Sequence, residues 1–405
     1  MDQDPLFDYY SPEFRADPYA FYRRLREEDP VHWGLPFEPY FDGAWHIATY
    51  ADVSAMLKDP RLGKAEAANE RMAALPIEAQ EYLGMLNLAL LRADPPDHTR
   101  LRALVSKAFT PRMVENLRPR IVATATALLD EAEASPEIDL IHQYAFPLSI
   151  TVITEMLGLT YDDREQLKRW SAALVAAQEC KRTPEIYGPA SQASAELVAF
   201  FHEQIVRQRE HPRPGILSDL IAVRDQDGDR LSENELIVTC ALLLIAGHDT
   251  TVNLIGNGML ALLRDPDQLA LLRENPQLIS SAVEEFLRYD SSSQMTGRIA
   301  REDVEYGGKV IHQGDQINLL MGSANHDPAQ FSNPDQLDIT RKDNRHIAFG
   351  HGIHFCLGAP LARLEAQVAI PLLLQRWPHV RLTDAEPERR QTIGFRGLNH
   401  LPVAG

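Results

Sequence analysis

The sequence predicts a mainly α-helical protein with minor β-sheets, and three observations support this prediction. Most of the 405 residues show the helical period of apolar side chains. Segments with the alternating pattern of strands are few and short. No internal repeat, low-complexity tract or linker divides the chain, so we expect residues 1–405 to form a single domain.

Helices account for most of the predicted elements. The first begins after Asp17, which is a good N-cap because the proline that follows it fits the first helical position. Further helices are expected at 48–59, 96–109, 112–133, 144–157, 162–178, 189–210 and 361–377.

Strand signals are confined to short segments. Residues 45–49 and 316–321 are two of them. Residues 304–306 and 309–311 flank Gly307-Gly308, a pair that tolerates the positive φ angles of a tight hairpin turn. Small sheets beside a helical body are therefore expected.

One helix is expected to be unusually long, from residue 233 to about residue 264. Ser232 and Glu235 have the spacing of a capping box at its start, and Asp265-Pro266 stops it. At a rise of 1.5 Å per residue, this helix is on the order of 45 Å long. A helix of that length must cross the whole domain.

The middle of this helix, AGHDTT at 246–251, is polar although its flanks are apolar on nearly every face. Gly247, Asp249 and Thr250 are weak helix formers at interior positions. Threonine hydroxyls can bond to carbonyls of the preceding turn, so we expect the helix to open locally here. Because a buried acid without a role is costly, the stretch is a candidate site rather than a solvated surface patch.

A second candidate site is the segment FGHGIHFCLG at 349–358. Cys356 lies just before the helix expected at 361–377, and a helix N-terminus lowers the pKa of a thiol. A thiolate among backbone N–H groups, with Phe349 and Phe355 beside it, is typical of the proximal ligand of haem iron. A buried structural cysteine, a nucleophilic cysteine–histidine pair and a zinc site are the alternatives. The zinc site would use His346, His351, His354 and Cys356, at spacings that are unusual for zinc.

Phe349, Gly352, Cys356 and Gly358 form F-x-x-G-x-x-x-C-x-G, which resembles the haem-binding signature of the cytochrome P-450 superfamily. Three further stretches resemble motifs of that family. Residues 93–102, ADPPDHTRLR, resemble the stretch that contacts the haem propionates in soluble bacterial members, 246–251 the oxygen-activating motif, and 285–288 the E-x-x-R motif. The resemblance covers essentially the whole chain and implies the cytochrome P-450 fold, with haem b between the long helix and the cysteine loop.

The resemblance implies a role for each matching residue. Cys356 would be the axial thiolate, whose electron donation favours O–O cleavage. Asp249 and Thr250 would relay protons to iron-bound dioxygen, for which Gly247 leaves room. Glu285 and Arg288, one helical turn apart, would form a buried network with Arg341. The other haem-binding residues would be Phe349, Gly358 and the partners of the propionates, His98, Arg102, Arg298 and His354.

The implied activity is that of a haem-thiolate monooxygenase, which hydroxylates a C–H bond or epoxidises an alkene and reduces the second oxygen atom to water. A peroxide-driven enzyme and a haem-based sensor are the alternatives, and the Asp249–Thr250 pair argues against both. The substrate would be a lipophilic small molecule, such as a polyketide, terpenoid or steroid.

By resemblance, residues 61–92 and 178–194 form the roof of the substrate cavity. The first of these segments contains apolar side chains that would line the cavity or serve as ordinary packing: Leu83, Met85, Leu86, Leu88, Leu90 and Leu91. The chain departs from many relatives at 291–293, where three serines stand near the usual position of a proline. They would make this wall of the cavity more polar or more mobile.

Composition limits the partners. The formal net charge of -18 and the pI near 5.2 argue against non-specific nucleic-acid binding. Between residues 98 and 120, however, six residues are basic and only one, Glu115, is acidic. Because the chain has no electron-donating domain, we expect an acidic ferredoxin to dock on this stretch, at Arg100, Lys107 and Arg112. Ordinary helix-face charges are the alternative.

The expected location is the cytoplasm. The three cysteines, Cys180, Cys240 and Cys356, do not form a disulfide framework. The acidic N-terminal segment contains prolines and does not resemble a signal peptide. The apolar run at 241–247 is much shorter than the roughly 20 residues that cross a bilayer, so no membrane anchor is expected.

Overall fold

The computed structural model describes residues 8–36, 41–64, 76–160, 163–178, 184–223 and 228–405. The chain divides into two compact units. The first comprises Met1–Gly63, Ala125–Phe146 and Thr250–Gly405, and the second comprises Lys64–Thr124 and Pro147–Asp249. Both units are assembled from separated segments, so no single cut in the sequence divides them. The organisation as one domain remains a prediction.

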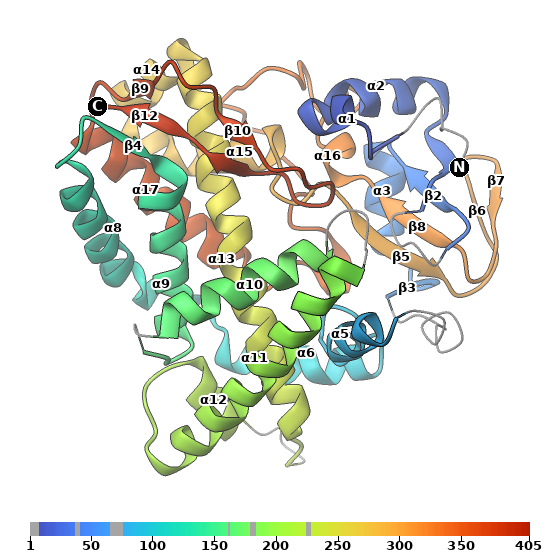
Figure 1. The fold of residues 1–405 in the computed structure, drawn as a ribbon. Helices are drawn as coiled ribbons and strands as arrows, with labels where there is room; N and C mark the ends of the chain where they lie inside the picture. Colours follow the sequence, from blue (N-terminus) through green and yellow to red (C-terminus); the bar gives the residue numbers. More distant parts are fainter. Residues whose placement is uncertain (1–7, 37–40, 65–75, 161–162, 179–183, 224–227) are drawn as a thin grey trace. The chain divides into compact units, whose positions relative to one another are not determined.

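A five-stranded sheet forms the largest β element of the first unit (Figure 1). Its strands lie in the order β1 (Val31–Gly34), β2 (Ala44–Ile47), β8 (Gln316–Leu319), β5 (Thr296–Ala300) and β3 (Leu62–Gly63). β2 and β8 run parallel, and the other neighbours are antiparallel. The apolar side chains of Ile47, Ile317 and Leu319 are fully buried with those of α3 (Tyr50–Met56), which explains why these short strands are stable.

Three smaller sheets complete the β structure of the described residues. The hairpin of β6 (Val304–Tyr306) and β7 (Lys309–Ile311) is confirmed, with φ angles of 57° at Gly307 and 73° at Gly308. Near the C-terminus, β4 (Glu137–Asp139), β12 (Pro402–Ala404) and β9 (Arg381–Leu382) form a three-stranded sheet, and β10 (Glu388–Arg389) pairs with β11 (Leu398–His400).

The first unit also contains helices. Asp17 caps α2 as expected, because its carboxylate accepts a hydrogen bond from the N–H of Tyr19 at 3.0 Å. The helices that lie wholly in this unit are α1 (Pro12–Ala16), α2 (Pro18–Glu28), α3, the π-helix η1 (Ile141–Ala145), α14 (Pro266–Glu274), η3 (Pro276–Leu278), α15 (Ile279–Tyr289), α16 (Met321–Ala324), η4 (Gly352–His354) and α17 (Ala359–Arg376).

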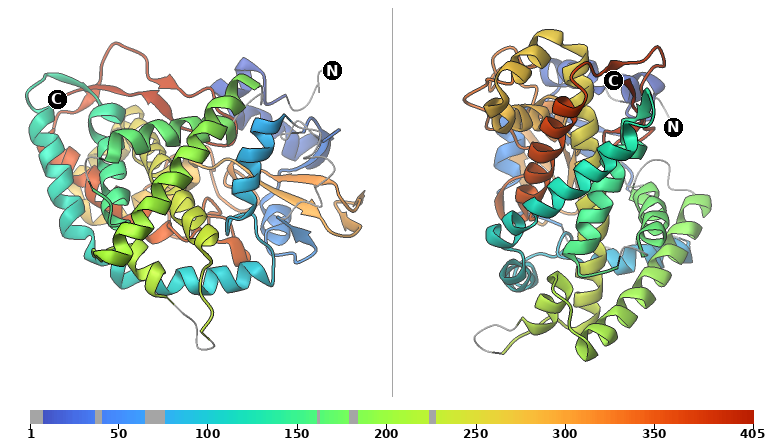
Figure 2. Two further views of the ribbon diagram at one scale, coloured as in Figure 1. Left: turned by 60° about the horizontal axis from the view of Figure 1, so that its bottom comes forward. Right: turned by 90° about the vertical axis from the view of Figure 1, so that its left-hand side faces the viewer.

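The second unit is helical among its described residues. The helices that lie wholly in this unit are α5 (Ile77–Asn87), α6 (Asp97–Ala108), α7 (Pro111–Asn116), α10 (Arg164–Gln178), α11 (Pro184–Glu210) and α12 (Ile216–Ala222). α11 packs against α10, α5 and α12 (Figures 1 and 2). The hydroxyl of Tyr82 on α5 donates a hydrogen bond to the carbonyl of Leu174 on α10 at 3.1 Å. Together, α5, α10 and α11 therefore form one packed group.

The long helix α13 (Glu233–Arg264) has the predicted bounds. The capping box is present: the N–H of Ser232 donates to Glu235 at 2.8 Å, and the N–H of Glu235 donates to the Ser232 hydroxyl at 3.3 Å. The expected local opening at 246–251 is wrong, since α13 continues as an α-helix through this stretch. α13 is long and apolar enough to cross a membrane by length and composition, but 67% of its most apolar window is buried, as in the core helix of a folded protein.

Three other expected boundaries are wrong. The helix expected at 112–133 is two helices, α7 and α8 (Arg118–Ala132), because Pro119 lacks the N–H that an uninterrupted helix would use. α11 begins at Pro184 and contains Pro189, which was expected at its start. The helix expected at 144–157 begins as η1 and continues as α9 (Phe146–Met156).

Candidate functional site

The segment 349–358 forms a tight loop before α17 in the first unit. The N–H of Cys356 donates to the carbonyl of Phe349 at 3.0 Å, and the N–H of Phe355 donates to the carbonyl of Gly352 at 3.1 Å. Gly350 and Gly352 have φ angles of 70° and 69°, which side chains rarely adopt. A Cβ at Gly352 would also lie 2.8 Å from the carbonyl oxygen of Leu57. This turn therefore requires glycine.

Cys356 is an exposed residue, whereas cysteines outside disulfides are usually buried. The buried-cysteine alternative is therefore wrong. Gly358 leaves one flank of the sulfur uncovered, since a Cβ at this position would approach Sγ to 3.9 Å. The loop thus presents one sulfur ligand beside a glycine, immediately before the N-terminus of α17. A flat group that needs a single thiolate ligand, such as haem, fits this arrangement.

The aromatic side chains beside the cysteine are held in place. The rings of Phe349 and Phe355 pack edge to face with centroids 6.3 Å apart, and the guanidinium of Arg363 lies 4.6 Å from the Phe349 centroid. Arg363 is fixed by two hydrogen bonds to Glu284, at 2.6 and 2.8 Å. Burial alone would raise the pKa of Glu284, but hydrogen bonds from Arg363 and His346 outweigh burial and lower this pKa to about 2.

The structure does not support a zinc site at the cysteine loop. The Nε2 of His346 bonds to Glu284 at 3.0 Å, and its Nδ1 accepts a hydrogen bond from the N–H of Ala348 at 3.2 Å. Both ring nitrogens of His346 are therefore in use. Among the described residues, the group of His, Cys, Asp and Glu side chains close enough to share a metal lies elsewhere and does not include Cys356.

The polar stretch of α13 is partly buried, since Ala246 is exposed and Thr250 is half-buried. In the second unit, Asp249 is 8% exposed, and His248 is 2% exposed. A Cβ at Gly247 would lie 2.7 Å from Cδ1 of Ile153 on α9, so the Ile153 side chain would have to shift to admit any larger residue at this position. Gly247 therefore has a packing role besides the role in leaving room for dioxygen that the resemblance implies.

The structure connects His248, within the polar stretch of α13, to α10. Its Nδ1 lies 2.8 Å from the carbonyl of Leu244, which can only accept, so Nδ1 carries a proton. Its Nε2 lies 3.2 Å from the hydroxyl of Ser171 on α10 and can accept from it. His248 thereby joins α10 to the polar stretch of α13. Sequence alone held no signal for this pairing, because the partner lies in a distant helix.

The four expected propionate partners fall in different units. His98 and Arg102 lie one turn apart on α6 in the second unit, and His98 is 3% exposed. Burial lowers the pKa of His98, and the neighbouring charge of Arg102 lowers it further. Arg298 on β5 and His354 in η4 belong to the first unit, and the buried Arg298 side chain donates to the carbonyl of Gly297 at 2.9 Å.

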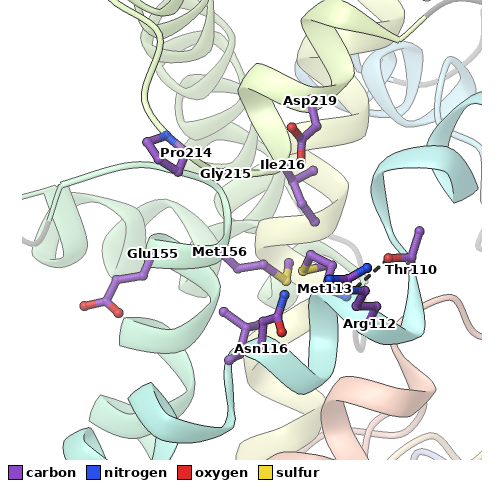
Figure 3. A pocket seen from close by; sticks show the side chains of 11 residues that line it. Thr110, Arg112, Met113, Asn116, Glu155, Met156, Pro214, Gly215, Ile216 and Asp219 are labelled. Atoms are coloured by element: carbon purple, nitrogen blue, oxygen red, sulfur yellow. Dashed lines mark hydrogen bonds between the residues drawn. The ribbon is translucent and has the colours of Figure 1, made fainter.

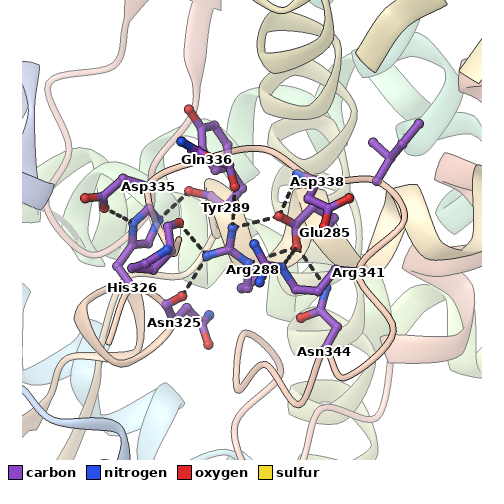
Figure 4. A network of polar contacts seen from close by, with 12 residues as sticks. Glu285, Arg288, Tyr289, Asn325, His326, Asp335, Gln336, Asp338, Arg341 and Asn344 are labelled. Atoms are coloured by element: carbon purple, nitrogen blue, oxygen red, sulfur yellow. Dashed lines mark hydrogen bonds and ion pairs between the residues drawn. The ribbon is translucent and has the colours of Figure 1, made fainter. Parts of the chain in front are cut away.

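Glu285, Arg288 and Arg341 form the expected network in the first unit (Figure 4). Arg288 donates to both carboxylate oxygens of Glu285, at 2.7 and 2.9 Å, and Arg341 donates to the same carboxylate at 3.0 Å. Glu285 and Arg288 are fully buried. The remaining donors of Arg288 bond to three backbone carbonyls between Asn325 and Gln336. The network therefore braces the chain that leads into the cysteine loop.

Two of the three serines at 291–293 are buried and hydrogen-bonded. The Ser291 hydroxyl donates to the carbonyl of Leu287 at 2.6 Å, and the Ser292 hydroxyl donates to the carbonyl of Thr250 at 2.9 Å. These two hydroxyls attach the segment to α15 and α13, and the expected polarity or mobility of this wall of the cavity stays a prediction.

Three of the six basic residues at 98–120 form ion pairs. Arg100 pairs with Glu235, Arg118 with Glu115, and Arg120 with Glu155. Arg100, which was expected to contact a ferredoxin, is therefore engaged within the second unit. Arg112 lines a surface pocket of about 370 Å³ together with Met113, Met156, Ile216 and others (Figure 3).

The roof expected at 61–92 and 178–194 is described only in part, since residues 65–75 and 179–183, including Cys180, lie outside the described residues. Residues 77–87 form α5 rather than an irregular loop. Leu83 and Leu90 are buried, whereas Leu88 and Leu91 are 48% and 45% exposed. Nothing is described of the Leu86 side chain.

Comparison with known proteins identifies the family. A family model described as "Cytochrome P450" matches residues 63–397. The chain is 44% identical over 396 residues to the biotin biosynthesis cytochrome P450 of Bacillus subtilis (strain 168), with 97% of each chain covered. It is 43% identical over 403 residues to the vitamin D(3) 25-hydroxylase of Pseudonocardia autotrophica, covering 98% of this chain and 96% of that protein.

Solved structures agree. The crystal structure of P450BioI in complex with hexadec-9Z-enoic acid ligated acyl carrier protein matches with a TM-score of 0.90 and 42% identity, over 98% of this chain and 100% of that chain. The structure of the myxobacterial cytochrome P450 CYP267B1 in complex with myristic acid matches with a TM-score of 0.90 and 39% identity, over 98% of each chain. The chain therefore belongs to the cytochrome P450 family, the haem-thiolate monooxygenases that bind haem b through a cysteine thiolate.

Proposed function

We propose that this cytochrome P450 holds haem b through Cys356 and uses dioxygen to hydroxylate or epoxidise a lipophilic small molecule. The observation that carries the proposal is Cys356, an exposed residue in a tight glycine-containing loop directly before the N-terminus of α17. A single thiolate before a helix N-terminus suits haem iron and does not suit zinc.

Other residues would hold the cofactor at its carboxylates. Arg298 and His354 in the first unit, and His98 and Arg102 in the second, are donors of the kind that bind propionates. Arg298 and His98 are each 3% exposed within their own units. When bound, the haem supplies dioxygen activation and oxygen transfer.

The proton-handling residues lie next to each other on α13. The carboxylate of Asp249 can take up and release a proton, and the hydroxyl of Thr250 can pass it on. His248 carries a proton on Nδ1 and is bonded at both ring nitrogens, so its role is to position α13 against α10 rather than to relay protons. The Asp249–Thr250 pair supports dioxygen rather than peroxide as the oxidant.

The substrate class is supported by relatives. Names of similar proteins include a vitamin D(3) 25-hydroxylase, a polyketide biosynthesis cytochrome P450 and a structure with myristic acid. These molecules share a long or bulky hydrocarbon part. We assign this chain a lipophilic substrate of that general kind, and a location in the cytoplasm.

The electron donor would be a separate ferredoxin that docks at Lys107 and Arg112. Arg112 has no ion-pair partner among the described residues, whereas Arg100 pairs with Glu235 and contributes less positive charge to a docking surface. Charge reversal at Arg112 should reduce the rate of electron transfer, and the reduction should shrink at high ionic strength. Arg381→Glu, at an exposed arginine on β9, is the matched control. Equal effects of both reversals would contradict docking at Arg112.

The decisive test of Cys356 is the difference spectrum of the reduced protein with and without carbon monoxide. The wild type should show the red-shifted band of thiolate-ligated haem, and Cys356→Ser should lose it. Cys240→Ala, which alters a fully buried free cysteine, should keep the band. A thiolate band in Cys356→Ser would show that another residue is the ligand.

A further inference from the structure

Asp139, His142 and His400 form a cluster far from the cysteine loop in the sequence. Asp139 ends β4, His142 lies in the π-helix η1, and His400 ends β11. One ligand atom from each lies within 4.8 Å of the other two. All three residues belong to the first unit. The activity proposed above makes no use of this cluster.

The side chains converge on a single oxygen atom. Oδ2 of Asp139 lies 2.8 Å from Nδ1 of His142 and 2.5 Å from Nδ1 of His400. The two imidazole rings stack, with centroids 4.9 Å apart and an angle of 28° between their planes. Both rings therefore direct the same nitrogen towards the same point.

The backbone holds the carboxylate in this orientation. Oδ1 of Asp139 accepts hydrogen bonds from the N–H groups of Ile141 at 3.0 Å and Leu401 at 3.1 Å. The N–H of Leu140 donates to the carbonyl of Leu401 at 2.9 Å, and β4 pairs with β12 directly beyond it. Oδ2 is thereby left for the histidines, and the cluster is organised before any ligand arrives.

Exposed hydrogen bonds alone give little reason for such convergence. His142 and His400 have side chains that are 49% and 54% exposed, and exposed pairs of this kind contribute little to stability. Two imidazole nitrogens and one carboxylate oxygen are, by contrast, a common ligand set for Zn²⁺ and related ions, with water in the fourth position. Ca²⁺ and Mg²⁺ prefer oxygen ligands and suit the cluster poorly.

The surroundings of His400 agree with a metal ligand. Oε2 of Glu388, on the neighbouring strand β10, lies 4.0 Å from the Nε2 of His400. A carboxylate near the second ring nitrogen is the usual arrangement around histidines that bind metals, where it orients the ring and increases its basicity.

We propose that Asp139, His142 and His400 bind one divalent transition-metal ion of the Zn²⁺ class through Oδ2 and the two Nδ1 atoms. The ion replaces the protons shared between the carboxylate and the imidazoles, and solvent completes its coordination. It links β11, close to the C-terminus, to β4 and η1, which precede it by more than half of the chain.

The π-helix η1, which carries His142, also packs against α13. Ile141, next to His142, packs its Cδ1 against Gly256, where a Cβ would lie only 2.6 Å away. Gly256 lies on the part of α13 that also carries Thr250. The metal would therefore stabilise η1 and its packing on α13, and it has a structural role rather than a catalytic one.

Zn²⁺ is the probe for the test. Holoenzyme stripped with EDTA and freed of the chelator is titrated with Zn²⁺ by calorimetry, and the bound metal is counted by mass spectrometry after desalting. We expect about one tightly bound Zn²⁺ per chain, and a loss of affinity of roughly tenfold or more in His142→Ala and His400→Ala. His142→Gln, which can still donate to Asp139, should lose the metal as well.

His312→Ala is the matched control. His312 is also an exposed histidine beside a carboxylate, with Nδ1 at 3.3 Å from Asp303, but it has no third ligand in the described cluster. This variant should retain wild-type Zn²⁺ affinity. Zn²⁺ should raise the Tm of the wild type and of His312→Ala, and leave the Tm of His142→Gln unchanged.

Two results would overturn the proposal. One is the absence of stoichiometric Zn²⁺ binding to the wild type. The other is equal binding by all variants, which would mean that Zn²⁺ attaches adventitiously to scattered histidines. The carbon monoxide difference spectrum of each variant verifies that the haem site is intact, so failure of the cysteine assignment is distinguishable from failure of the metal site.

Discussion

The hydroxyl of Ser292 donates a hydrogen bond to the backbone carbonyl of Thr250 at 2.9 Å. This bond connects the segment after α15 to α13, at the residue whose own hydroxyl is the proposed proton donor. The N–H of Arg396 in turn donates to the carbonyl of Ser292 at 2.8 Å, so the segment is held from both sides. Ser292 is therefore a residue that positions Thr250.

Ser292→Ala should increase the share of electrons lost to hydrogen peroxide. Removing the bond to Thr250 deletes an interaction worth about 0.5–1.5 kcal/mol and loosens α13 at the proton relay. Peroxide formed per electron pair consumed measures the effect, with Thr250→Ala as the reference for complete loss of the hydroxyl. Ser293→Ala is the control, because its hydroxyl makes only a long bond of 3.4 Å to Met295. Peroxide release equal to that of the wild type would contradict the positioning role.

Breaking the buried network at Glu285 should be strongly destabilising. Glu285→Gln leaves the fully buried Arg288 without its counter-charge, and losing one partner of a buried ion pair costs about 3–5 kcal/mol. The free energy of unfolding in urea measures the change. An exposed pair provides the control: Arg345→Ala removes a bond to Asp343 whose partners are 77% and 73% exposed, and it should change stability by less than about 1 kcal/mol. Similar losses in both variants would show that burial of the Glu285 network is not decisive.

Substitutions at Gly350 and Gly352 should separate backbone strain from steric overlap in the cysteine loop. Both residues have φ near 70°, so alanine at either position costs about 1–2 kcal/mol from backbone conformation. Only at Gly352 does the added Cβ also meet the carbonyl of Leu57, at 2.8 Å, whereas the space at Gly350 is open. Gly352→Ala should therefore lose more haem and more stability than Gly350→Ala. Haem content per chain and Tm measure the difference, and a larger loss in Gly350→Ala would contradict it.

Acid should weaken the support of the cysteine loop through Glu284. The folded protein lowers the pKa of this carboxylate from an ordinary 4.5 to about 2, so over this range the unfolded chain binds more protons than the folded one. The stabilisation is fully present above about pH 4.5 and is lost as pH falls towards about 2. The free energy of unfolding should thus fall less steeply between these pH values in Glu284→Gln than in the wild type. Parallel curves for the two proteins would exclude a contribution from Glu284.

The sequence predicts those structural features that depend on residues close together along the chain. The capping box at Ser232 and Glu235 and the hairpin turn at Gly307-Gly308 involve residues only a few positions apart. The bounds of α13 follow from such signals at both ends. Pro119 accounts for the division between α7 and α8. The apolar periodicity by itself predicts one continuous helix in this region.

The candidate site was predictable for a different reason. The glycines, aromatic residues and thiol of the cysteine loop are typical of a thiolate ligand of haem iron, and the resemblance to the family signature favoured this prediction over the alternatives. The ion pair of Glu285 and Arg288 follows from helical spacing, but its complete burial does not, since the same spacing is common on exposed helices. Arg100 was predicted to contact a ferredoxin, but its positive charge is paired with Glu235. Glu235 lies in the first turn of α13, far from Arg100 in the sequence, so this pairing was not predictable.

By itself, the sequence determined the mainly helical class, the long central helix, the hairpin and the cysteine loop, because each depends on residues that are neighbours along the chain. The tertiary structure alone decided that Ser292 bonds to Thr250, that His248 meets Ser171, and that His400 joins Asp139 and His142. These contacts join segments that are distant in sequence. They arise only when burial of apolar surface brings those segments together, and no local pattern of residues encodes which segments will meet.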